Sequence, residues 1–187
     1  MYLHKTAVSA ECLLTGILKK AKEIARKDSA LFATPPLKVF LLEDYSKADF
    51  ISKAELLEQF AGLDDSDIAV AIKIWAGHSD SVLSDLCNRL INRKLFKIHL
   101  RKTPFSEIEM SAIKDEIQHN FKLDSKDLSY YFLQGALVNN AYSTQSDSIG
   151  ILLKSGEIQD ITEAADTLNL KVLSEPVMKY FCCFPKV

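Results

Sequence analysis

The chain has 187 residues, of which 48% are hydrophobic and 26% are charged, a composition typical of a soluble globular protein and not of a disordered one. Its 23 Lys and Arg residues against 25 Asp and Glu residues give a formal net charge of −2, which disfavours nucleic-acid binding over the whole surface. No apolar run is suited to a signal peptide or a membrane span, so we expect a cytoplasmic protein with no membrane partner.

The first predicted element is an amphipathic helix over residues 3–27. Its apolar residues recur at helical spacing, and basic residues gather near its end, where positive charge complements the helix dipole. Such a helix has little to pack against on its upstream side. We therefore expect that a further part of the protein precedes it.

Further helices are predicted after the Thr34-Pro35-Pro36 break. Residues 37–42 read as a short strand or an extended apolar connector, and helices are predicted at 52–60, 66–75 and 80–91. Side-chain oxygens suited to capping the helix at 66–75 come from Asp64, Asp65 and Ser66, and Ser79 or Asp80 can cap the helix at 80–91. The chain is thus predicted to be helical up to about residue 91.

The pattern changes in the second half. Residues 94–102 alternate as a strand, with Lys97, His99 and Arg101 on one face, and Pro104 with Ser106 opens a helix to about residue 121. Strands are predicted at 130–137, 148–153 and 177–184, with a tight turn at 154–157. This order predicts an α+β fold: a helical region over residues 1–91, followed by a small antiparallel sheet packed with one or two helices over residues 92–187.

Two groups of residues resemble metal ligands but are better explained as helix caps. His78-Ser79-Asp80 has the composition of a turn and an N-cap, and the acidic Asp64, Asp65 and Asp67 stand where a helix begins. The glycines form neither a phosphate-binding loop nor a nucleophile motif. The sequence therefore predicts no complete catalytic apparatus, no metal site and no cofactor in this chain. Its four cysteines, at positions 12, 87, 182 and 183, are expected to be buried reduced thiols.

The basic stretch of residues 89–102 has two interpretations. The aligned Lys97, His99 and Arg101 could hold phosphate oxygens together, or they could form the solvated face of an edge strand that is protected from aggregation by its charge. The residues alone favour the second interpretation.

Three short motifs add a family resemblance. Tyr2-Leu3-His4-Lys5, then residues 63–68, then Asn92-Arg93-Lys94-Leu95-Phe96-Lys97 occur in an order that resembles the C-terminal part of HD-domain phosphohydrolases. That family includes the SAM- and HD-domain deoxynucleotide triphosphohydrolase and bacterial dGTPase-like enzymes. Its catalytic domain holds a divalent metal through a His-Asp doublet, which this sequence lacks. The resemblance implies an accessory region whose N-terminal HD domain is missing from this chain.

The resemblance also implies roles for five residues. Arg93 and Lys97 match the Arg and Lys that help bind an activating guanine nucleotide at a subunit interface, although Lys94 replaces the family Asn. Tyr2 would line a substrate pocket, and His4 and Lys5 would approach a second, allosteric nucleotide. The implied partners are the missing HD domain, further copies in a homo-oligomer, and a nucleotide effector.

Two other functions are considered. A stand-alone, non-enzymatic interaction module would bind a protein partner through an exposed apolar face of the first helix, including Leu13, Leu14 and Ile17. Single-stranded nucleic acid could meet the basic strand with the aromatic residues 130–132, but aromatic residues at this spacing are more often part of a core.

Overall fold

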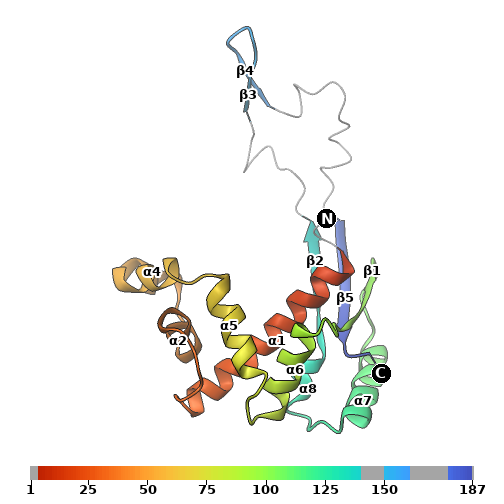
Figure 1. Cartoon of the computed structure of the whole chain (residues 1–187). Coiled ribbons are helices and arrows are strands. Elements are labelled where there is room, and N and C mark those ends of the chain that lie inside the picture. The colour runs from red at the N-terminus through yellow and green to blue at the C-terminus, as the bar shows by residue number, and fades with distance from the viewer. Residues whose placement is uncertain (1–3, 140–149, 161–176, 187) are drawn as a thin grey trace.

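The computed structural model describes residues 4–139, 150–160 and 177–186. Helices occupy most of the first half of the chain, and antiparallel strands follow, as Figure 1 shows. The predicted α+β class is confirmed. Among the described residues, no helix combines the length and the apolarity that crossing a bilayer requires.

The long first helix, α1 (Lys5–Lys27), lies at the centre of the molecule (Figure 1). It packs against α6, α8 and β1, and Gly16 allows this close approach because a side chain there would meet the Tyr130 carbonyl oxygen at 3.0 Å. Leu13 and Ile17 are fully buried in these contacts. The proposed interaction module is therefore wrong about this surface: the apolar face of α1 is covered by the chain's own elements and is not open to a partner.

The structure corrects the prediction for residues 37–42. They belong to a helix, α2 (Pro35–Leu42), in which the two prolines stand at the first positions. Proline is well suited to a helix start because its fixed φ is already helical and its missing N–H would have had no partner there. The proline pair thus begins a helix as well as separating it from α1.

Two short helices follow α2. The predicted helix at 52–60 corresponds to α4 (Ala54–Ala61), while α3 (Lys47–Ser52) was not predicted. A capping box between Ser46 and Asp49 begins α3. Together α2, α3 and α4 form a lobe beside the main body (Figure 1).

The next two helices confirm the predicted caps. The side chain of Asp64 accepts from the backbone N–H of Ser66 at 2.7 Å at the start of α5 (Asp65–Trp75). Asp80 accepts from Leu83 N–H at 2.9 Å at the start of α6 (Ser81–Ile91), and His78 Nδ1 accepts from Asp80 N–H at 3.0 Å. The acidic cluster at Asp64 and the segment His78-Ser79-Asp80 therefore both lie where a helix begins, as predicted.

One three-stranded antiparallel sheet carries the second half. Its strand order is β1 (Lys97–Arg101), β5 (Val177–Phe184), β2 (Leu133–Asn139), so the last strand lies between the other two. Lys97 pairs with Phe184, and His99 pairs with Cys182. The helix α7 (Glu107–Phe121) begins at Ser106, as predicted.

The remaining elements depart partly from expectation. The strand predicted from residue 130 begins only at Leu133, because Tyr130 and Tyr131 lie in a short helix, α8 (Leu128–Tyr131). A separate two-stranded sheet joins β3 (Gly150–Leu152) to β4 (Ile158–Asp160). Gly156 supplies the predicted turn with a φ of 89°. Residues 148 and 149 of the predicted strand lie outside the described residues.

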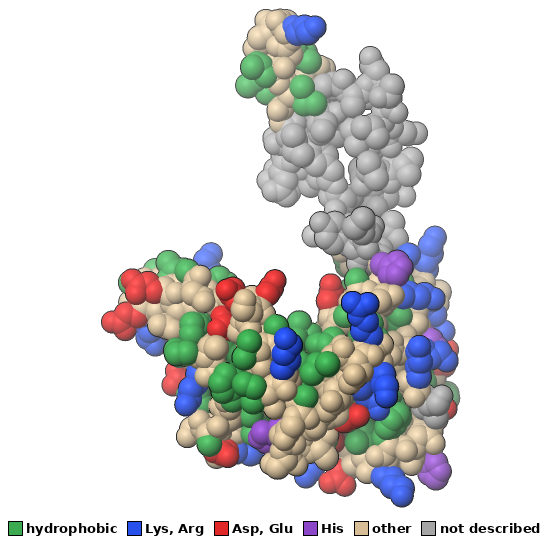
Figure 2. Space-filling model, viewed as in Figure 1, with side chains coloured by type: hydrophobic (Ala, Val, Ile, Leu, Met, Phe, Trp, Pro, Cys, Tyr) green, Lys and Arg blue, Asp and Glu red, His purple; other side chains and the backbone are tan. Residues whose placement is uncertain are grey.

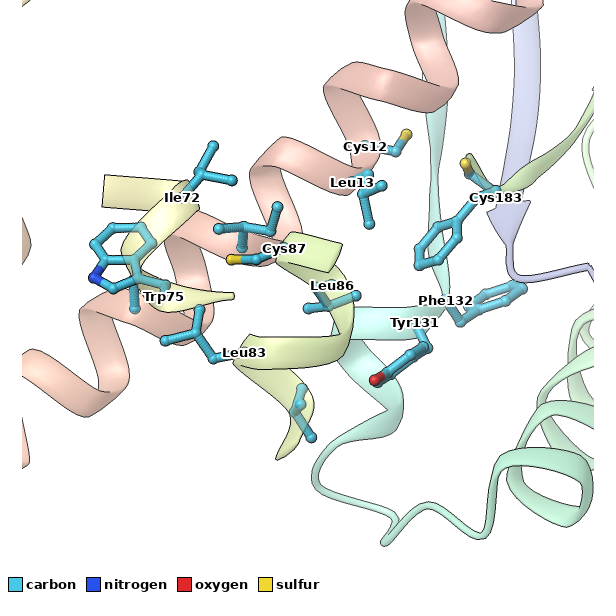
Figure 3. Packing of buried hydrophobic residues seen from close by; sticks show 14 of the residues in the cluster. Cys12, Leu13, Ile72, Trp75, Leu83, Leu86, Cys87, Tyr131, Phe132 and Cys183 are labelled. Atoms are coloured by element: carbon cyan, nitrogen blue, oxygen red, sulfur yellow. The ribbon is translucent and has the colours of Figure 1, made fainter. Parts of the chain in front are cut away.

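A single cluster of buried side chains connects the helices to the sheet (Figure 3). Trp75 and Leu86 belong to it, and so do Tyr131 and Phe132, which are 3% and 7% exposed and cannot stack on the bases of a nucleic acid. All four cysteines are buried and free, as predicted. This core draws on residues of both halves of the chain. The division into two structural regions near residue 92 remains a prediction.

Candidate functional site

The connection from α6 to β1 is fixed by backbone hydrogen bonds. Arg93 N–H donates to the Leu90 carbonyl oxygen at 3.2 Å, and Lys94 N–H donates to the Arg89 carbonyl oxygen at 2.8 Å. This is a Schellman motif, in which the residue after the C-cap takes a left-handed conformation that glycine adopts most easily. Arg93 takes it with a φ of 55°. The motif directs the chain into β1 and leaves the Arg93 side chain exposed beyond the end of α6.

Strand β1 is attached to α1 along its inner face. Ser9 Oγ donates to the Phe96 carbonyl oxygen at 2.6 Å, and Phe96 and Ile98 are buried. Lys97 and His99 alternate with them and are exposed. The predicted two-faced strand is confirmed over these residues.

The exposed face of β1 borders a groove of about 460 Å³. Its described lining comes from β1, α7 and the end of β5, and consists of Lys97, His99, Ile113, Glu116, Phe184 and Lys186. The His99 ring meets the edge of the Phe184 ring, with centroids 5.2 Å apart and planes at 77°. The Lys97 Nζ lies 6.0 Å from the centroid of the same ring. The groove is therefore lined by the aromatic ring of Phe184, with the basic side chains of Lys97 and His99 beside it.

The charges around the groove act on His99. Partial burial lowers the pKa of His99 below its ordinary value, and the positive charges of Lys97, Lys5 and Arg101 lower it further. Lys5 belongs to the first turn of α1, which is remote in sequence from β1. The fold thus brings the start of α1 and β1, which both contain predicted site residues, close enough for their charges to favour the neutral form of His99.

Arg101 differs from its neighbours on this face. Its guanidinium donates to both carboxylate oxygens of Glu109, at 2.8 and 2.7 Å, and lies 3.9 Å from the Phe105 ring centroid. Arg101 and Ser106 hold the pKa of Glu109 at about 2. The sequence placed Arg101 with Lys97 and His99 as a possible phosphate ligand, but in the structure it joins β1 to the start of α7.

The remaining basic side chains here have no ion-pair partner among the described residues. No described carboxylate lies within 4.0 Å of the side chain of Lys5, Arg93, Lys94, Lys97 or Lys186. Figure 2 shows Lys and Arg side chains gathered over the start of α1 and β1, and Asp and Glu side chains over α4. We call Lys5, Lys97, Lys186 and His99 the basic face, because Lys5 and Lys97 act on His99 and Lys186 lines the groove with Lys97 and His99.

The five residues singled out from the sequence have different positions. Lys5 and Lys97 both act on His99, and Arg93 precedes β1 in the Schellman motif. His4 caps α1, where its Nδ1 accepts from Thr6 N–H at 3.3 Å. Tyr2 lies outside the described residues.

Four of the six groove residues were not identified as site residues from the sequence. Two of them are charged: Lys186 follows the last strand, which pairs with β1, and Glu116 lies in α7. No local motif marks either residue. In the part of the chain that the structure describes, no three His, Cys, Asp or Glu side chains are placed to hold a metal ion.

Comparison with known proteins gives two similar chains. No family model matches this sequence. The uncharacterised protein YwfO of Bacillus subtilis (strain 168) is 28% identical over 169 residues, which cover 87% of this chain and 36% of YwfO. A phosphohydrolase of Bacteroides thetaiotaomicron with a solved structure is 37% identical, with a TM-score of 0.83, over 100% of this chain and 46% of its own.

The chain thus spans less than half the length of either protein. The likeness to the solved structure covers every part of the present chain, including the α1–β1 region and the sheet. It supports a phosphohydrolase-related fold.

Proposed function

We propose that this chain is the C-terminal accessory region of an HD-superfamily, metal-dependent nucleotide phosphohydrolase that resembles the deoxynucleotide triphosphohydrolases. The observation that carries the proposal is the match of the whole chain to a phosphohydrolase more than twice as long. The three motifs in family order give the finer assignment. In this role the region completes the protomer, contributes contacts between copies, and offers cations to an effector.

In this proposal the divalent metal of the enzyme is bound outside this chain. The described residues contain no cluster of side chains that fits it. We therefore assign the metal, and the hydrolysis that it would support, to an HD domain outside this chain. We assign the substrate pocket that Tyr2 would line to the same HD domain.

Recognition of effector nucleotides is assigned to the basic face together with Arg93 and His4. Arg93 and Lys97 would hold the phosphate groups of an activating nucleotide, and His4 and Lys5, at the start of α1, would approach a second, allosteric nucleotide. What supports this is that Lys5 and Lys97 lie within electrostatic reach of one imidazole and have no described carboxylate partner. A cluster of uncompensated cations is costly unless an anion binds there.

Thermal unfolding with added nucleotide tests this proposal on the chain itself. A ligand that binds only the folded state, at 100 times its Kd, stabilises it by about 2.7 kcal/mol. We expect GTP or a deoxynucleoside triphosphate to raise the Tm, and Lys97→Met to remove most of that increase. Lys73→Met is the matched control, because Lys73 is an exposed lysine on α5.

An unchanged Tm with every nucleotide would contradict the effector role. The hydrolase assignment has a separate test, which is nucleotide turnover, with divalent metal present, by the longest natural polypeptide that contains this chain. Inactivity toward every nucleotide would contradict that assignment.

A further inference from the structure

The groove beside β1 contains basic residues that the roles of Arg93 and Lys97 do not explain. His99 lines it from β1 together with Lys97, and Lys186 lines it from just after β5, which pairs with β1. Its volume of about 460 Å³ is in the range of sites that bind small molecules. The groove is therefore large enough to admit a chain of linked phosphate groups.

Positive charge dominates this groove. The charged groups that face His99 are Lys97 and Arg101 from β1, Lys5 from α1, Lys186 after β5, and Glu116 from α7. Arg101 is already paired with Glu109. Among the described lining residues Glu116 supplies the one carboxylate, and it forms no ion pair with Lys97 or Lys186 within 4.0 Å. The groove thus has an excess of positive charge that an anion would neutralise.

His99 is the group whose charge can change when an anion arrives. Its ring is held against Phe184 but remains exposed to the groove. Burial and the neighbouring cations lower the pKa of His99, which favours the neutral imidazole. A bound anion reverses the sign of the local field and favours the imidazolium, which can donate from both nitrogens.

We propose that this groove binds an oligophosphate, with Lys97 and Lys186 as charged ligands and His99 as a ligand that takes up one proton from solvent on binding. The inference deepens the effector role, and it rests on the proposed phosphate contact of Lys97. The shared ligand chemistry is a chain of linked phosphates. It could come from a nucleoside triphosphate or from inorganic polyphosphate.

Calorimetric titration of the 187-residue chain at low salt with inorganic tripolyphosphate tests the site. We expect Lys97→Met and Lys186→Met each to weaken binding about tenfold, since each loses a charge-assisted contact. Glu116→Gln should strengthen binding about threefold, because it removes the carboxylate that opposes the anion. Lys73→Met, on α5, should bind like the native chain.

The pH dependence isolates His99. Because binding raises the pKa of His99, the affinity increases as the pH falls from 8 to 6 and levels off below the pKa of the free protein. Tripolyphosphate also titrates in this range, so the measure is the difference between the native chain and His99→Gln. We expect the native chain to gain at least about threefold over His99→Gln between pH 8 and pH 6.

The source of the phosphate chain is identified by comparing nucleoside triphosphates with inorganic tripolyphosphate. If ATP or a deoxynucleoside triphosphate binds at least tenfold more tightly than tripolyphosphate, the natural ligand is a nucleotide. If tripolyphosphate binds as tightly, the site reads the phosphate chain alone. Either result supports an oligophosphate groove, whereas tighter binding of single-stranded DNA than of both would overturn it.

The proposal is also overturned if tripolyphosphate does not bind, or if Lys97→Met and Glu116→Gln both leave its affinity unchanged. Urea unfolding of each variant shows whether the fold is kept, and a histidine NMR titration follows His99 directly in any variant that folds. Since these measurements detect binding and not turnover, a failure here is distinguishable from an absence of hydrolase activity.

Discussion

Two lysines illustrate opposite uses of positive charge in this chain. Lys20, on α1, is 6% exposed, with its Nζ 3.3 Å from an Asp80 oxygen and 3.4 Å from an Asp127 oxygen. Its Nζ also lies 5.1 Å from the centroid of the Tyr130 ring. Lys97 is exposed and has no described carboxylate within 4.0 Å.

The difference separates cations that hold the fold together from cations that can receive a ligand. Lys20 joins α1 to the start of α6 and to the residue before α8, so its charge is already used by the protein. Burial lowers the pKa of Lys20, but Asp80 and Asp127 more than offset this, and the pKa is raised. Lys97 has no such partner among the described residues, and its charge is available to an anion there.

The largest expected effect comes from removing the Lys20 charge. Lys20→Met leaves two partly buried carboxylates without their cation, and we expect a loss of about 2 to 4 kcal/mol in the free energy of unfolding. Urea denaturation measures it. Lys19→Met is the control, because Lys19 is an exposed neighbour on the same helix. Equal midpoints for the two variants would contradict the structural role of Lys20.

The pH dependence of that loss follows from the raised pKa of Lys20. A raised folded-state pKa means that the stabilisation is complete below the unfolded pKa of lysine and is lost as the pH rises through the folded-state pKa. The stability difference between the native chain and Lys20→Met should therefore be constant from pH 7 to 9 and decrease in strongly alkaline solution. A difference that disappears on going from pH 9 to pH 7 would contradict this ion pair.

A smaller effect, this time stabilising, is expected when Arg93 is replaced by glycine and not by alanine. Its left-handed backbone favours glycine, so Arg93→Gly should raise the free energy of unfolding by up to about 1 kcal/mol relative to Arg93→Ala. Both variants lose the guanidinium, and both should weaken nucleotide binding equally. Urea midpoints and calorimetry check the two statements. If alanine proved as stable as glycine, the Schellman geometry would not be under strain.

Lys97 should have the smallest effect on stability. Lys97→Met is expected to change the free energy of unfolding by no more than about 0.5 kcal/mol, because the side chain removed is exposed and forms no ion pair with a described residue. It should also raise the pKa of His99, since one repelling charge is lost. Histidine NMR titration detects that change, and an unaltered or lowered pKa would contradict the electrostatic account of the basic face.

Local chemistry explains which elements could be predicted. The caps at Asp64, Asp80 and Ser106 bond to backbone within three residues, so their positions are visible in sequence. The alternation around Lys97 is local in the same way. The prediction of a strand beginning at Tyr130 was wrong. Aromatic residues suit strands, but Tyr130 lies in α8, where its backbone packs against Gly16 of α1.

The site was less predictable because distant segments form it. The motifs identified Lys97 and Arg93, but Lys186 and Glu116 join the groove only through strand pairing and the packing of α7. Arg101 shows the converse, since its pairing with Glu109 is a tertiary contact that removes it from the predicted ligands. Sequence patterns indicate which face a charge occupies, but not whether a carboxylate already neutralises it.

The most direct test of the proposed function is a nucleotide turnover assay on the longest natural polypeptide that contains this chain, with divalent metal and with an added effector nucleotide. The account predicts hydrolysis that the effector stimulates, with a higher effector concentration needed for half-maximal stimulation of the Lys97→Met variant. Absence of hydrolysis with every nucleotide, or stimulation that is identical in the variant, would contradict it.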